Sequence, residues 1–209
     1  MTHQNKNKIS KGVFFAILFI FLFLISSANA ADRFWVASGS GDKIWWDNNN
    51  WSNHSGGTPG ANPPSGSDKA YFDANSILDV NVTTNVTVNK IIMRGGYTGT
   101  ININIPSGQF NAKQGVVHSG GTIEVSDGEL RSGKAYTLGA GGHGPTLTFT
   151  GNTSKFRLNH NFIMYNGSTF TAPGAGASRF ILKGGFRLNG GTFDHNDGTL
   201  RMNSRYDGQ

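Results

Sequence analysis

The sequence lacks cysteine, carries little charge and contains no apolar run long enough to span a membrane. Without Cys, neither a disulfide framework nor a cysteine-ligated zinc site can form. Charged residues make up 14% of the 209 residues, and glutamate occurs only at Glu124 and Glu129, which excludes a coiled coil. Glycine is abundant, at 30 residues, but has no strict three-residue period, which excludes collagen. The length fits one domain, with or without a short extra segment.

Residues 1–30 have the three-part form of a secretory signal peptide. Three lysines lie within the first eleven residues, an apolar run of 13 residues follows over 13–25, and Ala28 and Ala30 make an A-x-A cleavage pattern. A membrane-spanning helix needs about 20 apolar residues, so this run is too short for an anchor. We therefore expect cleavage after Ala30, and a mature chain of residues 31–209 without a transmembrane span.

Removal of that segment lowers the apparent basicity of the chain. Residues 31–209 carry 15 basic and 12 acidic side chains, a net charge of about +3 instead of +6. The arginines are scattered over different segments: Arg94, Arg131, Arg157, Arg179, Arg187 and Arg201. Nucleic-acid recognition needs a clustered basic face, so we expect no nucleic-acid partner. An exported chain that does not depend on oxidative folding fits a bacterial cell surface.

A repeat of about 23 residues organises the chain from residue 100 onward. Five short alternating segments, each preceded by a glycine-containing turn, begin at intervals of 22, 24, 23 and 23 residues: Thr100, Thr122, Thr146, Thr169 and Thr192. A second segment follows each of these, with one apolar marker per repeat: Phe110, Leu130, Phe156, Phe180 and Leu200. Self-similarity at a fixed period is the signature of a repeat architecture.

Three short strands in every 22–24 residues predict a parallel β-helix. One coil cannot bury its inward residues alone, whereas coils stacked about 4.8 Å apart pair every strand and build a continuous core. We expect an all-β solenoid of about five to six coils, in which residues 77–89 form an additional early coil. This register places four residues in one inward column: Ile123, Leu147, Phe170 and Phe193. An antiparallel sandwich is the competing interpretation, and the fixed period disfavours it.

The segment before the repeats, residues 31–76, is irregular and holds all four tryptophans. A solenoid needs a cap, because a bare first coil exposes apolar core and unpaired strand edges. We expect this segment to form an aromatic N-terminal cap packed by Trp35, Trp51, Tyr71 and Phe72. The alternative is a glycan-binding platform, for which the candidate contact residues are Trp45, Trp46 and Asp47.

The acidic residues and histidines predict no catalytic, metal or cofactor site. A glycosidase needs two carboxylates facing each other across about 5–9.5 Å, whereas Glu124 and Glu129 are expected on different faces of one coil. Residues 194–197, Asp-His-Asn-Asp, offer oxygen ligands for Ca²⁺ but are also ordinary turn formers. The histidines lack metal-binding spacing, and no phosphate-binding, dinucleotide or nucleophile-elbow motif occurs. We expect a non-enzymatic protein.

Several motifs follow one another through the mature chain: Trp45 to Ser52, Pro63-Pro64, Asp68 to Asp73, Val86 to Val88, Gly95 to Thr100, Gly190 to Phe193 and Asp197 to Leu200. In this order they resemble the repeat regions of large secreted bacterial surface proteins, namely adhesins and autotransporter passengers with right-handed, pectin-lyase-like parallel β-helices. The resemblance implies a secreted, cell-surface location and contact with glycans, host cells or neighbouring cells. It carries over no catalytic residue.

The leading hypothesis is thus an adhesin-like surface or matrix protein without enzymatic activity. The alternatives are a β-helical polysaccharide lyase or hydrolase, and a glycan-binding module that uses the tryptophan cluster. The repeat region, residues 77–209, shows no evident cap, since residues 203–209 are polar apart from Tyr206. We expect this region either to be truncated or to self-associate through its open last coil.

Overall fold

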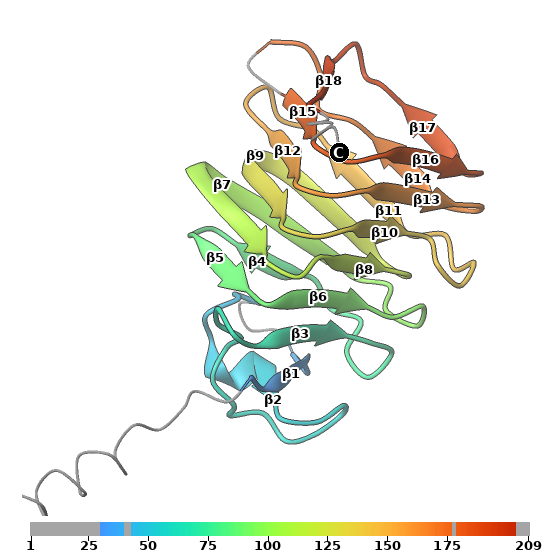
Figure 1. Ribbon diagram of the computed structural model, residues 1–209. Helices are drawn as coiled ribbons and strands as arrows, with labels where there is room; N and C mark the ends of the chain where they lie inside the picture. Colours follow the sequence, from blue (N-terminus) through green and yellow to red (C-terminus); the bar gives the residue numbers. More distant parts are fainter. Residues whose placement is uncertain (1–29, 40–42, 177–178, 204–209) are drawn as a thin grey trace, which may run out of the picture.

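The computed structural model describes residues 30–39, 43–176 and 179–203, which form a parallel β-solenoid of about six turns (Figure 1). The only helix among them is a short 3₁₀ turn, η1 (Asn48–Asn50). Every strand pairing in this part of the chain is parallel except that of β1 with β2. The predicted solenoid is confirmed, and the antiparallel alternative is excluded. The predicted signal peptide, apart from Ala30, lies outside the described residues.

Two sheets wind around one core. Sheet A contains, in spatial order, β16 (Phe186–Asn189), β13 (Phe162–Tyr165), β10 (Tyr136–Leu138), β8 (Val116–His118), β6 (Lys90–Met93), β3 (Lys69–Phe72), β1 (Asp32–Trp35) and β2 (Trp51–Ser52). Sheet B has two halves that meet at a bend. Its first half contains β4 (Val80–Val82), β11 (Thr146–Phe149), β14 (Thr169–Thr171) and β17 (Thr192–Asp194). Its second half contains β5 (Val86–Val88), β12 (Lys155–Leu158), β15 (Arg179–Leu182) and β18 (Leu200–Met202). Both halves share β7 (Thr100–Ala112) and β9 (Thr122–Ser132).

In-register stacking builds the core from columns of apolar side chains. Leu147 lies opposite both Ile123 and Phe170, and Phe170 lies opposite Phe193, so the predicted inward column is confirmed. The first three are fully buried, and Phe193 is partly buried against them. Each fully buried side chain of this kind contributes roughly 1.5–3 kcal/mol relative to exposure, so the columns supply the main stabilisation of the solenoid.

The bend in sheet B differs from the sequence prediction. We expected two short strands joined by a turn in every coil, but in β7 and β9 the two segments merge into one bent strand with a shifted register near residues 104–109. Gly128 lies at the bend with φ 89°, and a Cβ there would come within 2.5 Å of the Ile105 carbonyl oxygen. Glycine therefore lets the backbone turn sharply without breaking the strand.

The aromatic cap is confirmed in part. Trp35, Trp51 and Phe72 are buried, and Trp51 meets the other two rings edge-on at centroid distances of 5.2 and 5.8 Å. Tyr71 lies instead on the outer surface of sheet A, where it stacks on Phe34 at 4.7 Å. The reason is the two-residue period of β3, which turns Phe72 inward and Tyr71 outward. The cap also supplies β1 and β3 to sheet A, so it continues the solenoid as well as covering it.

Candidate functional site

The outward positions of the two sheets form three faces of different chemistry. One outer column of sheet A makes a mostly apolar face, which ends at Arg187: Phe34, Tyr71, Ile92, Val117, Thr137 and Ile163. The first half of sheet B makes a threonine face, free of basic side chains in its strands: Thr100, Thr122, Thr146, Thr169 and Thr192. The second half makes a basic face: Arg131, Lys155, Arg157, Arg179 and Arg201.

Parallel stacking creates the basic face from residues that are far apart in the sequence. Arg131 lies opposite Arg157, and Lys155 lies opposite Arg179 on the neighbouring strand. Arg201 ends the same column as Arg157, with Ile181 between them. The expectation that the basic residues are dispersed is therefore wrong for this face, because residues one coil apart in sequence lie only about 4.8 Å apart across the strands.

The charge of the basic face is only slightly neutralised. Glu129 is the one acidic side chain in its two outer columns, and its Oε1 lies 3.0 Å from Nε of Arg157. This pair is partly exposed, at 35% for Arg157 and 17% for Glu129, so it contributes at most about 1 kcal/mol. Among the residues that the structure describes, no carboxylate lies within 4 Å of the other four cations. Such a surface raises the local concentration of anions.

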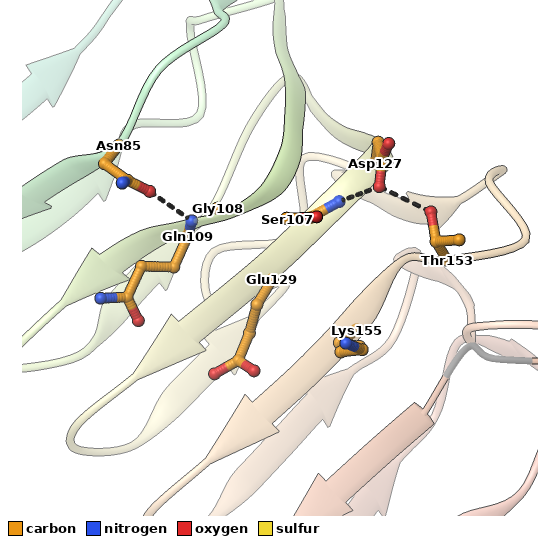
Figure 2. Close-up of a pocket in the computed structure, with 9 residues that line it drawn as sticks. Asn85, Ser107, Gly108, Gln109, Asp127, Glu129, Thr153 and Lys155 are labelled. Carbon is orange, nitrogen blue, oxygen red and sulfur yellow. Dashed lines mark hydrogen bonds between the residues drawn. The ribbon is translucent and has the colours of Figure 1, made fainter.

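A polar groove of about 490 Å³ lies along the bend, at the edge of the basic face (Figure 2). Its walls carry amide, hydroxyl and charged groups: Asn85, Ser107, Gln109, Asp127, Glu129, Thr153 and Lys155. Asn85 Oδ1 accepts a 2.7 Å hydrogen bond from the backbone N–H of Gln109, which fixes the wall between two coils. A second hollow, of about 250 Å³, lies further along the same face between Arg179 and Arg201.

The two carboxylates of the groove are each held by other groups. Oδ1 of Asp127 accepts hydrogen bonds from the Gly128 N–H at 2.7 Å and from the Thr153 hydroxyl at 2.6 Å. Glu129 is bound to Arg157. Figure 2 shows the Asp127 carboxylate turned toward Thr153 and the Glu129 carboxylate extended in a different direction. Glu124 lies on the threonine face and thus on a different face from Glu129, as the sequence predicted, and it accepts a 3.2 Å hydrogen bond from the Thr150 hydroxyl.

The residues predicted for glycan contact do not form one platform. Trp45 is completely buried and packs edge-on against Phe110, so its assignment as a glycan contact is wrong. Trp46 is 47% exposed, and its indole N–H donates to the Thr84 hydroxyl at 2.7 Å. Asp47 caps η1 by accepting from the Asn49 N–H at 2.9 Å. Trp45 and Trp46 are the two central residues of a turn closed by the hydrogen bond from the Asp47 N–H to the Ile44 carbonyl, and only Trp45 is directed into the core.

The Asp194–Asp197 segment, which the sequence offered either as a turn or as a Ca²⁺ site, adopts a turn. Oδ1 of Asp194 accepts from the Asn196 N–H at 2.8 Å, and Asn196 and Asp197 both have positive φ, at 50° and 52°. Asn and Asp tolerate this conformation better than other non-glycine residues. Within the part of the chain that the structure describes, no three His, Cys, Asp or Glu side chains gather in a way that would hold a metal ion.

One buried polar pair escaped the sequence reasoning. His118 lies inside sheet A, with Met93 and Leu138 on the neighbouring strands, and forms a hydrogen bond with the Tyr136 hydroxyl. Burial lowers the pKa of His118 to about 4, despite opposing hydrogen bonds to the Gly120 and Gly121 backbone. The two-residue alternation of β8 would have predicted that His118 is buried, because His118 lies two residues after the inward Val116.

No protein-family profile, curated protein sequence or solved structure matches the chain. The resemblance to bacterial surface proteins is therefore supported only in its parallel β-solenoid architecture. Among the described residues, no helix combines the length and apolar character that a membrane crossing requires.

Proposed function

We propose that the chain is a secreted, non-enzymatic surface or matrix protein that adheres to acidic polysaccharides through its basic face. The observation that carries this proposal is the stacking of five cationic side chains on one face of a stiff solenoid, against a single carboxylate. A rigid array loses little conformational entropy when it binds, which favours contact with a long repetitive polymer.

The lining of the groove favours a sugar polymer over other polyanions. Hydroxyl and amide groups of Ser107, Gln109 and Asn85 lie beside Lys155 and suit the mixture of hydroxyl and anionic groups on an acidic polysaccharide. The two outer columns of the basic face contain no aromatic side chain on which a nucleobase would stack. A polymer that runs along the solenoid axis would contact one further cationic side chain at each successive coil, about every 4.8 Å.

The absence of an activity is part of the proposal. Asp127 and Glu129 are engaged by Thr153 and Arg157, and they point in different directions. Hydrolysis of a glycosidic bond uses two carboxylates that face each other across the substrate. Secretion is supported by the leader-like residues 1–30.

The test is binding of the mature chain, residues 31–209, to four polymers: a polyuronate, a sulfated glycan, a neutral glucan and double-stranded DNA. We expect binding to the two acidic glycans, with affinity that falls steeply as salt is raised. Equal binding to the neutral glucan, or preference for DNA, would overturn the proposed partner. Continuous release of shortened polysaccharide would instead establish the lyase or hydrolase alternative.

A matched pair of variants locates the contact. One variant replaces Arg131, Arg157 and Arg201 with Gln on the basic face. The control replaces Lys69, Lys90 and Arg187 with Gln on the side of sheet A, so both lose three positive charges. We expect the first variant to lose at least tenfold in affinity and the control to lose much less. Equal losses would show that net charge, and not the basic face, governs binding.

A further inference from the structure

Asp68 is a buried carboxylate directed at the nitrogen of Ala31. Asp68 as a whole residue is only 7% exposed, and Oδ1 of its carboxylate accepts a 2.9 Å hydrogen bond from the Ala31 N–H. Oδ2 accepts from both the backbone N–H and the hydroxyl of Ser65, each at 2.9 Å. The carboxylate therefore joins the start of β1 to the loop that precedes β3.

This carboxylate has no counter-ion in the described part of the uncleaved chain. No Lys, Arg or His nitrogen there lies within 4.0 Å of it. Burial alone would raise the pKa of Asp68, but hydrogen bonds from Ala31 and Ser65, together with the charge of Arg33, hold its pKa below the usual value. An ionised carboxylate is costly to bury unless it is paired or fully hydrogen-bonded.

Ala31 is also the residue that follows the predicted cleavage bond. Ala30 is exposed, whereas the Ala31 carbonyl accepts a 2.9 Å hydrogen bond from the Lys69 N–H, so the backbone of β1 is anchored from this residue onward. The sequence pattern and the hydrogen bonding thus mark the same position by independent routes. The A-x-A pattern concerns recognition by a peptidase, whereas the hydrogen bonds show that the folded structure fixes the backbone from Ala31 onward.

We propose that Asp68 receives the new N-terminus of the mature chain and forms a partly buried ion pair with the α-ammonium group of Ala31. A signal-peptide hydrolase adds one water across the Ala30–Ala31 amide bond. The water oxygen goes to the Ala30 carbonyl carbon, which becomes a carboxylate. The nitrogen of Ala31 keeps the electron pair of the broken bond, takes up both protons of the water and becomes an ammonium group. The neutral N–H donor facing Asp68 is thereby replaced by a positive one, so processing supplies the missing counter-ion.

The ion pair would tighten the cap end of the solenoid. The Asp68 carbonyl accepts a 2.8 Å hydrogen bond from the Asn89 N–H in the next coil, so Asp68 links the N-terminus, the Ser65 loop and the solenoid. Hydrogen bonds between charged groups are roughly twice as strong as neutral ones. This proposal concerns maturation and stands independently of the polysaccharide partner.

The first test compares two forms of residues 31–209, one with a free α-amine on Ala31 and one with that amine acetylated. Acetylation keeps an N–H but removes the charge. We expect the equilibrium constant for unfolding, measured in urea at pH 6.5, to rise about fivefold or more on acetylation. We also expect the pKa of the Ala31 amine, followed by NMR, to lie above the ordinary value of about 8. Equal stability of the two forms and an ordinary amine pKa would overturn the proposal.

A double-mutant cycle separates the ion pair from general charge effects. In Asp68→Asn, acetylation is expected to change stability by less than about twofold, because the partner charge is gone. Asp32→Asn is the matched control, since Asp32 is next to Ala31 in sequence but pairs with Lys69 on the surface. It should keep the full acetylation effect. If Asp68→Asn does not fold, the pKa of the Ala31 amine in the unmodified chain decides whether the ion pair forms. N-terminal sequencing of the exported full chain must also give Ala31 first, and any other start overturns the assignment.

Discussion

The imidazole of His118 and the phenol of Tyr136 form a 2.9 Å hydrogen bond inside sheet A. The other ring nitrogen, Nε2, lies 3.1 Å from the Gly121 carbonyl oxygen, which can only accept. Nε2 therefore carries the proton, and Nδ1 accepts from the Tyr136 hydroxyl. Both groups are fully buried, and burial lowers the pKa of His118 while it raises that of Tyr136. The pair is a neutral network that a positive charge disrupts.

The His118–Tyr136 pair predicts loss of stability in mild acid. His118 has a pKa of about 4 in the fold and an ordinary value of 6.5 when unfolded, so the unfolded chain binds the extra proton first. The free energy of unfolding is expected to be highest above pH 6.5, to fall as pH drops toward 4, and to lose roughly 3 kcal/mol in total from this group. Urea unfolding at intervals between pH 4 and 7.5 measures this slope.

The control for that slope is the double variant His118→Leu/Tyr136→Phe. It removes both polar partners together, and the Gly121 carbonyl keeps its hydrogen bond from the Thr146 N–H. We expect stability close to that of the unmodified chain at pH 7.5 and little slope between pH 6.5 and 4, so that the variant is the more stable of the two at pH 4. A slope as steep as the original would assign the acid sensitivity to carboxylates elsewhere.

The inward column predicts very unequal effects for adjacent residues of β14. Phe170→Asp places an unpaired charge in the core and should reduce the free energy of unfolding by more than about 4 kcal/mol, or prevent folding. Thr171→Asn, on the outer surface, should change it by less than about 0.5 kcal/mol. Circular dichroism during urea unfolding compares the two. Similar losses would contradict the register shown by Leu147 and Phe193.

The architecture could be predicted from the sequence because period and alternation act together. The threonine spacing fixed the coil length, and the residue after each threonine fixed the inward column, as Ile123 and Phe170 show. Glu124 and Glu129 were placed on different faces for the same reason. These features depend on positions within a repeat, which one sequence displays several times.

The basic face was missed because it depends on which side chains meet across coils. Arg131 and Arg157 looked scattered when the sequence was considered linearly, and only their strand register brings them together. The merged strand β9 was missed because Gly128 predicts a turn, and whether the chain turns fully or only bends is decided by its neighbours. Trp45 was misplaced because aromatic character alone does not distinguish a cap residue from an exposed one.

Opposite substitutions at the Glu129–Arg157 pair should change polyanion binding in opposite directions. Glu129→Gln removes the only acidic group of the two outer columns, and affinity for a polyuronate should rise about two- to fivefold at low salt. Arg157→Gln should lower it by a similar factor. Both effects should shrink at high salt, because exposed charges are screened. Changes in the same direction would show that the pair matters for folding and not for binding.

The last described coil predicts self-association. Its strands β16, β17 and β18 each pair on one side only, and three large side chains there are 37–53% exposed: Leu188, Leu200 and Met202. Light scattering of residues 31–209 should show a molar mass that rises with concentration. Replacing Leu200 and Met202 with Lys should abolish the rise. Replacing Ile77, which is 54% exposed on the cap side, with Lys should leave it unchanged. A constant monomer mass would refute association through this end.

The in-register stacking of β9, β11 and β14 also governs which changes of length the gene can tolerate. Excision of residues 146–168 would remove one whole coil and place Phe170 directly against Ile123, so every column would continue, one step shorter. Deletion of a single residue within a strand would turn the remaining side chains of that strand to the opposite side, whereas the turns absorb one residue more or less, as the intervals of 22, 24 and 23 residues show. Duplication or loss of complete repeats is thus the step by which such a chain can grow or shrink while its three surfaces keep their character.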